Sequence, residues 1–162
     1  MSSVAIAVFV HSTEDEERAR RAVMSVLPHE LRELTRFSVE IFNGHFGDHI
    51  TVLRAEHKKK AAGILRYVLM SMEPASRKEF LNNIEDRIDK SGNLYIRLDK
   101  QQAFLGIIEP GDSDSVRLKL HLQGSGHDLS PQDTRRYLMD MVEKPDLQAS
   151  DSGGDLLGQK VR

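Results

Sequence analysis

The sequence predicts an α+β fold in which helices pack on one face of a mainly antiparallel sheet. Two runs, at 94–99 and 116–122, alternate between apolar and polar residues, as strands with one buried face do. Apolar residues recur at helical spacing in 19–27, 61–72 and 80–88. The helices therefore have apolar stripes that can cover the apolar face of the sheet.

The N-terminal part is expected to contain a strand, a helix and a hairpin. Residues 4–10 are apolar throughout and predict a largely buried strand. Thr13 and Glu16 have the spacing of a capping box, which predicts that a helix begins there. Two alternating runs flank an Asn-Gly turn, so residues 37–55 are expected to form an antiparallel hairpin.

Three further helices follow from start signals along the chain. The lysine-rich stretch 57–60 is expected to start one helix, which ends at Pro74. Ser76 and Glu79 form a second capping box and predict the next helix. The Ser130-Pro131 pair predicts the start of the last helix, because proline is favoured at the first helical position.

A second hairpin is expected to begin with the alternating strand at 94–99. A polar turn at 100–102 and an apolar run at 103–105 follow it and predict a returning strand. Together with the strand at 116–122, these segments are expected to form a three-stranded meander. If the strands at 94–99 and 116–122 pair, their polar residues share one outer face.

Composition limits the class of protein. Residues 1–144 predict a single domain, and the sparse apolar content of 145–162 predicts a flexible tail. The chain has no cysteine, which excludes disulfides and thiolate metal sites. The N-terminus lacks the form of a signal peptide, and its apolar run is too short to span a membrane, so a cytoplasmic protein is expected.

The loop at 44–49 contains the side chains that most resemble a metal-binding or catalytic site. His45, Asp48 and His49 could ligate a metal, but their spacing matches no metal motif, and turn formation explains them. Gly44, His45 and Gly47 form a loop whose backbone amides could approach a phosphate or another chain. No nucleophile, phosphate-binding loop or dinucleotide fingerprint is present, so the sequence predicts no enzyme, no metal and no cofactor.

Basic residues near an aromatic one suggest nucleic-acid binding. The candidate RNA contacts are Arg54, Lys58, Lys59, Lys60, Tyr95, Arg97, Lys100, Arg117 and Lys119. The cations would meet phosphates and Tyr95 would stack on a base. The net charge of −2 requires this patch to be local. An ordinary solvated sheet face and a protein-interaction module, such as a homodimer, remain the alternatives, with a metal-dependent enzyme as a remote one.

Three motifs at 11–15 (HSTED), 44–50 (GHFGDHI) and 94–106 (LYIRLDKQQAFLG) stand in this order in the chain. Over about 4–122, the chain resembles an archaeal family of predicted RNA-binding proteins and exosome subunits. The resemblance implies a fold similar to large-subunit ribosomal protein five. It also implies an accessory role in RNA processing or ribosome maturation, with RNA and exosome or ribosome components as partners.

The chain departs from this family in the second motif. Asp48 stands where the family usually has Asn, and His49 where it commonly has Pro. A carboxylate at this place would repel an approaching phosphate.

Overall fold

The computed structural model describes residues 2–124 and 127–144. Within these residues, five strands form one antiparallel sheet in the order β2-β3-β1-β5-β4. The strands are β1 (Ser3–His11), β2 (Ser38–Asn43), β3 (His49–Lys58), β4 (Asn93–Asp99) and β5 (Ser115–His121). The predicted α+β class with an antiparallel sheet is confirmed. The predicted tail, 145–162, lies outside the described residues.

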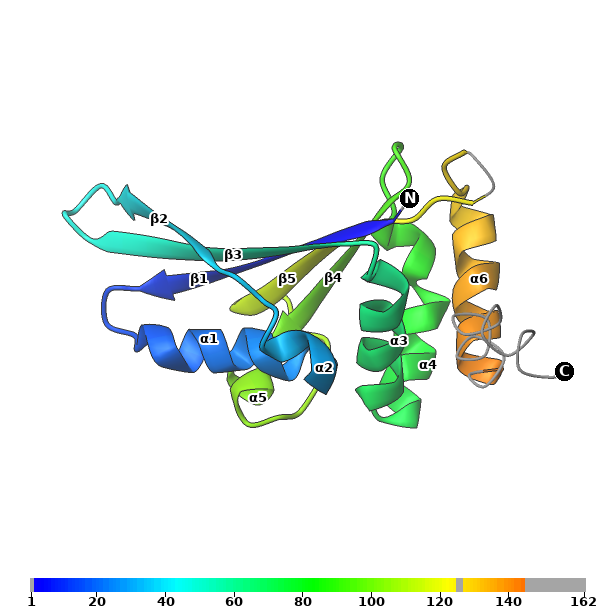
Figure 1. Ribbon diagram of the computed structural model, residues 1–162, viewed down its shortest axis with the longest axis horizontal. Coiled ribbons are helices and arrows are strands. Elements are labelled where there is room, and N and C mark those ends of the chain that lie inside the picture. The colour runs from blue at the N-terminus through cyan, green and yellow to red at the C-terminus, as the bar shows by residue number, and fades with distance from the viewer. Residues whose placement is uncertain (1, 125–126, 145–162) are drawn as a thin grey trace, which may run out of the picture.

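Helices lie on one side of this sheet and leave the other side uncovered in the described chain (Figure 1). They are α1 (Glu16–Ser25), α2 (His29–Arg32), α3 (Ala61–Ser71), α4 (Pro74–Asn82), the 3-10 helix η1 (Ile84–Arg87), α5 (Lys100–Phe104) and α6 (Pro131–Glu143). None of the helices in the described part combines the length and the apolar character that a membrane crossing needs.

The core lies between the sheet and the helices. Alternate residues of the strands point into it and are buried, as predicted for Leu94, Ile96, Leu98, Val116, Leu118, Leu120 and Leu122. The apolar stripes of α1 and α3 meet them from the other side. Since strand side chains alternate between faces, the odd-numbered residues of β4 and β5 must lie on the uncovered face.

The predicted strand at 103–105 is wrong, and with it the polar turn and the three-stranded meander. Residues 100–104 form helix α5, because the Asp99 side chain caps it by accepting a hydrogen bond from the Gln102 amide at 2.9 Å. Gly106 follows in the left-handed region, with φ of 84°, which glycine tolerates. Strand β4 therefore pairs with β5 and with no strand between them.

Helix starts also differ from the prediction. Asp15, and not Thr13, caps α1, with its side chain accepting from the Glu17 amide. Helix α4 starts at Pro74, where proline fits the first turn. The lysine-rich stretch does not start a helix as a whole: His57 and Lys58 still belong to β3, where Lys58 pairs with Ser3 of β1, and α3 begins only after Lys60.

Two other local predictions are confirmed. Ser130 caps α6 and accepts a hydrogen bond from the Asp133 amide. The hairpin of β2 and β3 forms as predicted, and Figure 1 shows it projecting beyond the helices. At its tip, Gly47 has φ of 78°, and the Gly44 amide donates to the Asp48 carbonyl at 2.6 Å.

Candidate nucleic-acid interface

The uncovered side of the sheet, called the open face below, carries most of the predicted site. Because β1 is central, the register brings residues from four strands into two neighbouring rows. One row contains Arg97, Arg117, Ala7 and Arg54; the next contains Tyr95, Lys119, Ala5 and Glu56. Adjacent strands lie about 5 Å apart, so three arginines share a span of about 15 Å. The shared outer face that the sequence predicted for β4 and β5 is present.

A shallow groove runs over the centre of the open face. Ala5 and Ala7 of β1 form its floor, because their methyl groups are the smallest side chains between two strands that carry long ones. Its volume is about 640 Å³. Arg117 and Lys119 line one side, and Arg54 lines the other. The groove is therefore flanked by cations on both sides.

The three arginines differ in how they are held. The guanidinium of Arg117 lies 4.7 Å from the centroid of the Phe9 ring, which occupies its flat side and leaves its N–H edges available. Arg54 donates to Glu40 at 3.2 Å in an exposed ion pair. Arg97 has no hydrogen bond or ion pair from its side chain within residues 2–124 and 127–144. Arg97 and Arg117 can thus donate hydrogen bonds to a phosphate without losing an existing ion pair.

Tyr95 is 39% exposed beside this groove, and a carboxylate fixes its position. Its hydroxyl donates to Asp89 at 2.9 Å, and the Lys119 ammonium lies 5.7 Å from its ring centroid. Asp89 also accepts from the side chain and amide of Asn93 and from the amide of Ser91. These hydrogen bonds, those of Asn93 first, lower the pKa of Asp89 to about 2. Asp89 therefore stays ionised at neutral pH and orients the ring.

The lysine run adjoins the open face at one end. Lys58 pairs with Ser3 at the end of β3, two residues beyond Glu56. Lys59 has a φ of 72°, and its amide donates to the Ser2 carbonyl at 2.9 Å. Lys60 caps α3. All three ammonium groups are exposed, but only Lys58 is placed on the sheet itself.

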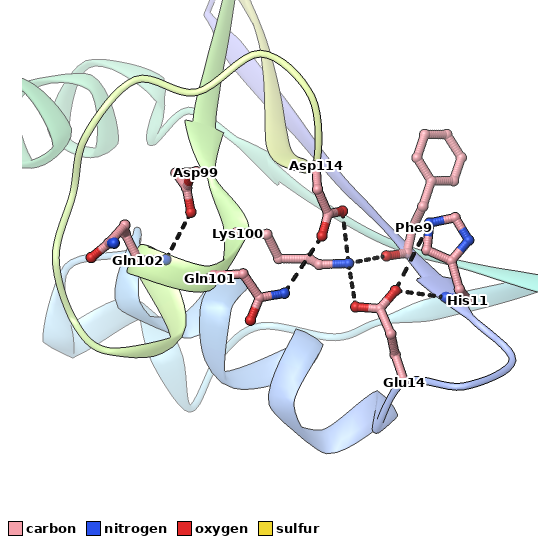
Figure 2. Close-up of polar contacts among 8 residues, drawn as sticks. All are labelled: Phe9, His11, Glu14, Asp99, Lys100, Gln101, Gln102 and Asp114. Carbon is pink, nitrogen blue, oxygen red and sulfur yellow. Dashed lines mark hydrogen bonds and ion pairs between the residues drawn. The ribbon is translucent and has the colours of Figure 1, made fainter.

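Lys100 is not part of the open face, which corrects its inclusion among the RNA contacts. The residue is 3% exposed, and Figure 2 shows its ammonium enclosed by acceptors. It lies 2.7 Å from a Glu14 oxygen, 2.8 Å from an Asp114 oxygen and 3.0 Å from the Phe9 carbonyl. Three acceptors use all three donors of an ammonium group. Lys100 therefore has neither the access nor a free donor for a phosphate.

The glycine loop lies away from the basic rows, at the far end of the hairpin. Phe46 at its tip is 93% exposed, and His49 shares a 2.7 Å hydrogen bond with Asn43. Gly44, His45 and Gly47 are therefore not brought next to Arg97 or Tyr95. Within the described ranges, no three histidine or acidic side chains gather where they could hold a metal ion.

Two residues of the groove were not recognised in the sequence. Arg36 lines the groove from the segment between α2 and β2. Because that segment has no regular period, the pattern could not assign Arg36 to a face. Glu56 also lines it, and its place two residues beyond Arg54 on an alternating strand could have indicated this.

Comparison with known proteins places most of the chain in a known family. The model of a protein family described as RNA binding matches residues 3–122. The chain belongs to this RNA-binding family. The matched residues cover the whole sheet and every open-face cation named above, and they end before α6.

The relatives come from archaea. RNA-binding protein PAB1135 from Pyrococcus abyssi (strain GE5 / Orsay) is 31% identical over 117 residues, which are 70% of this chain and 76% of that protein. The crystal structure of protein AF2318 from Archaeglobus fulgidus, of the DUF54 family, has a TM-score of 0.69 and 27% identity, covering 86% of this chain and 97% of that one. The structure of Mth689, a DUF54 protein from Methanothermobacter thermautotrophicus, has a TM-score of 0.67 and 25% identity, covering 86% and 96%.

These matches confirm the predicted resemblance to an archaeal RNA-binding family. The likeness to large-subunit ribosomal protein five stays a prediction.

Proposed function

We propose that the protein binds RNA through the open face of its sheet and catalyses no reaction on it. The observation that carries this proposal is the row of Arg97, Arg117 and Arg54 across the groove of a chain whose net charge is −2. A chain with a slight excess of acids has no general attraction to polyanions, so cations gathered on one face indicate a local anion site.

RNA would contact this face in two ways. The guanidinium edges of Arg97 and Arg117 and the ammonium of Lys119 would meet phosphates. A base would stack on the exposed ring of Tyr95, which its bond to Asp89 already orients. Since the alanine floor is narrow and flanked by long side chains, the groove suits a single strand with splayed bases better than a rigid duplex.

The family resemblance extends the proposal to a cellular role. We propose that the protein is an accessory factor in RNA processing, associated with the exosome, or in ribosome maturation, and that it acts in the cytoplasm. The family name and the name of its relative from Pyrococcus abyssi support RNA as the partner.

A second candidate function is a protein-interaction module, for example a homodimer. The observation that favours it is the projecting hairpin, where Val39, Ile41 and Phe46 are exposed apolar residues. Strand β2 is also an edge strand with unpaired backbone groups, which can accept a strand from another chain.

Salt titration separates the two candidates. Single-strand affinity should fall with log salt by about 0.7 per phosphate contact, so the Arg97→Ala/Lys119→Ala double variant should lower that slope by about 1.4. The matched control is Arg135→Ala/Arg136→Ala on α6, which removes the same charge from the helical side of the molecule and should leave the slope unchanged. Fluorescence anisotropy with a labelled RNA strand, repeated over a range of salt concentrations, gives the slope for each double variant.

Tyr95→Leu tests stacking in the same assay. It should weaken binding by about 1–3 kcal/mol with little change of slope, because a leucine removes the ring without removing a cation. An unchanged slope in the folded double variant removes Arg97 and Lys119 from the site. Absence of RNA binding by the wild type at physiological salt favours the interaction module instead.

A further inference from the structure

The groove is lined by one acidic residue, Glu56, whose side chain has no polar partner in the described part of the chain. Glu56 is exposed on the open face of β3, between Arg54 and Lys58 on the same strand. In residues 2–124 and 127–144 its carboxylate makes no ion pair and no hydrogen bond. The other open-face glutamate, Glu40, is instead held by Arg54 at 3.2 Å.

The surroundings leave space in front of this carboxylate. Ala5 lies directly beside Glu56 in the sheet, and Lys119 follows on the far side of Ala5. The Lys119 ammonium leans away, over the ring of Tyr95. Two strand spacings, about 10 Å, therefore separate Glu56 from the opposite side of the groove, with only a methyl group between them.

A free carboxylate is a poor neighbour for an RNA backbone. It repels phosphates, so it weakens the site unless it makes a contact of its own. An ionised carboxylate only accepts hydrogen bonds, so its partners on RNA are the N–H groups of the bases and the 2′-hydroxyls of the riboses. The 2′-hydroxyl is the same in every nucleotide, so only the base N–H groups can give a sequence preference. Phosphates held by Arg54, Arg117 and Lys119 would leave a base over the alanine floor in front of Glu56.

We propose that Glu56 selects the base that occupies the groove, favouring bases with an exocyclic amino group and guanine above all. Guanine presents its N1–H and N2–H side by side, so both carboxylate oxygens can accept. Cytosine and adenine offer one amino group. Uracil has no amino group, and its single N–H lies between two carbonyl oxygens that a carboxylate repels. This assignment rests on the proposed RNA binding and names the sequence preference of that site.

The test compares strands that differ at one base. The probes are an oligouridine of about eight nucleotides, within the usual size of single-strand sites, and the same strand with one guanosine or one inosine. Inosine keeps the N1–H and lacks the amino group. The wild type should bind the guanosine strand about tenfold more tightly than oligouridine, with inosine between them.

Glu56→Gln keeps the shape of the side chain and removes its charge. It should reduce the preference for guanosine to less than about twofold, and oligouridine should bind at least as tightly as to the wild type because a repulsion is lost. The control is Asp140→Asn on α6, which changes the net charge equally on the helical side and should keep the tenfold preference.

The outcomes separate the two levels of the proposal. Equal binding of all strands by the wild type, or a full preference in Glu56→Gln, overturns the role of Glu56 and leaves RNA binding in place. Failure of the wild type to bind any of these strands overturns the proposed function, and the role of Glu56 with it.

Discussion

At the scale of single residues, Arg97 and Lys100 are cations only three positions apart, but one is available to a ligand and the other is buried in an ion cluster. Arg97 lies on the open face with no polar partner among residues 2–124 and 127–144, whereas Lys100 is enclosed by Glu14, Asp114 and the Phe9 carbonyl (Figure 2). The β1–β5 ladder ends at the pair of Ala7 and Arg117, so Lys100 supplies a donor to the β1 backbone beyond that end. Its role is structural, because it links the start of α5 to β1 and to Glu14, in the turn between β1 and α1.

Lys100→Met tests this role. The variant keeps an apolar stem of similar length and removes the ammonium, which should lower the free energy of unfolding at neutral pH by about 1.5–3 kcal/mol, the range for hydrogen bonds to charged groups. A urea titration measures the change. Lys78→Met, at an exposed position of α4, is the control and should stay within about 0.5 kcal/mol of the wild type.

The effect of Lys100→Met also depends on pH. Burial alone would raise the pKa of Glu14, but hydrogen bonds from Lys100 and the His11 amide, with the charge of Lys100, outweigh it and lower the pKa below its usual 4.5. A lowered carboxyl pKa stabilises the fold above the unfolded value, and this contribution is lost as pH falls through the folded value. The difference between wild type and variant should therefore shrink below pH 4.5. A difference that is constant down to pH 3 would contradict the ion cluster.

At the scale of elements, the strands were more predictable than the helix starts. The alternation through Leu94, Ile96 and Leu98 assigned the buried face correctly. Continued by one step, the same alternation places Lys100 on the buried side. Lys100 was nevertheless predicted to be exposed, because it is charged. Capping pairs were ambiguous because Thr13 and Asp15 both fit a helix start, and the structure uses Asp15. Local patterns rank such alternatives poorly, since the choice depends on how the whole helix packs.

Leu118→Ala tests the buried face of β5. Leu118 is 1% exposed and belongs to the core between the sheet and the helices, so the cavity left by its side chain should cost about 2–5 kcal/mol of unfolding free energy. Chemical denaturation measures it. The neighbouring Lys119→Ala, on the open face of the same strand, should change stability by less than about 0.5 kcal/mol. Equal costs at both positions would refute the assignment of the two faces.

At the scale of the whole molecule, strand order creates the groove. Ala5 and Ala7 resemble ordinary residues of a buried strand in the sequence. They become a groove floor only because β1 lies between β3 and β5, which carry long side chains on the same face. Ala5 and Ala7 pair with residues more than 40 positions away in the chain, and no local pattern encodes such pairing. The sequence therefore predicted the open-face cations of the strands but not the groove, Arg36 or Glu56.

If RNA binds only the open side of the molecule, it should protect the lysines of that side from chemical modification and leave those of the helical side reactive. RNA bound on the open face should shield Lys58 and Lys119 from acetylation, because both lie on that face of the sheet. Lys78 on α4 and Lys144 after α6 should react equally with and without RNA. Lys100 should react slowly in both states, since it is buried. Mass spectrometry of peptides after brief treatment with an acetylating reagent gives the extent of reaction at each lysine.

Equal protection of the lysines on both sides would mean that RNA coats the protein through charge alone. Protection confined to the helical side would place the interface away from the sheet.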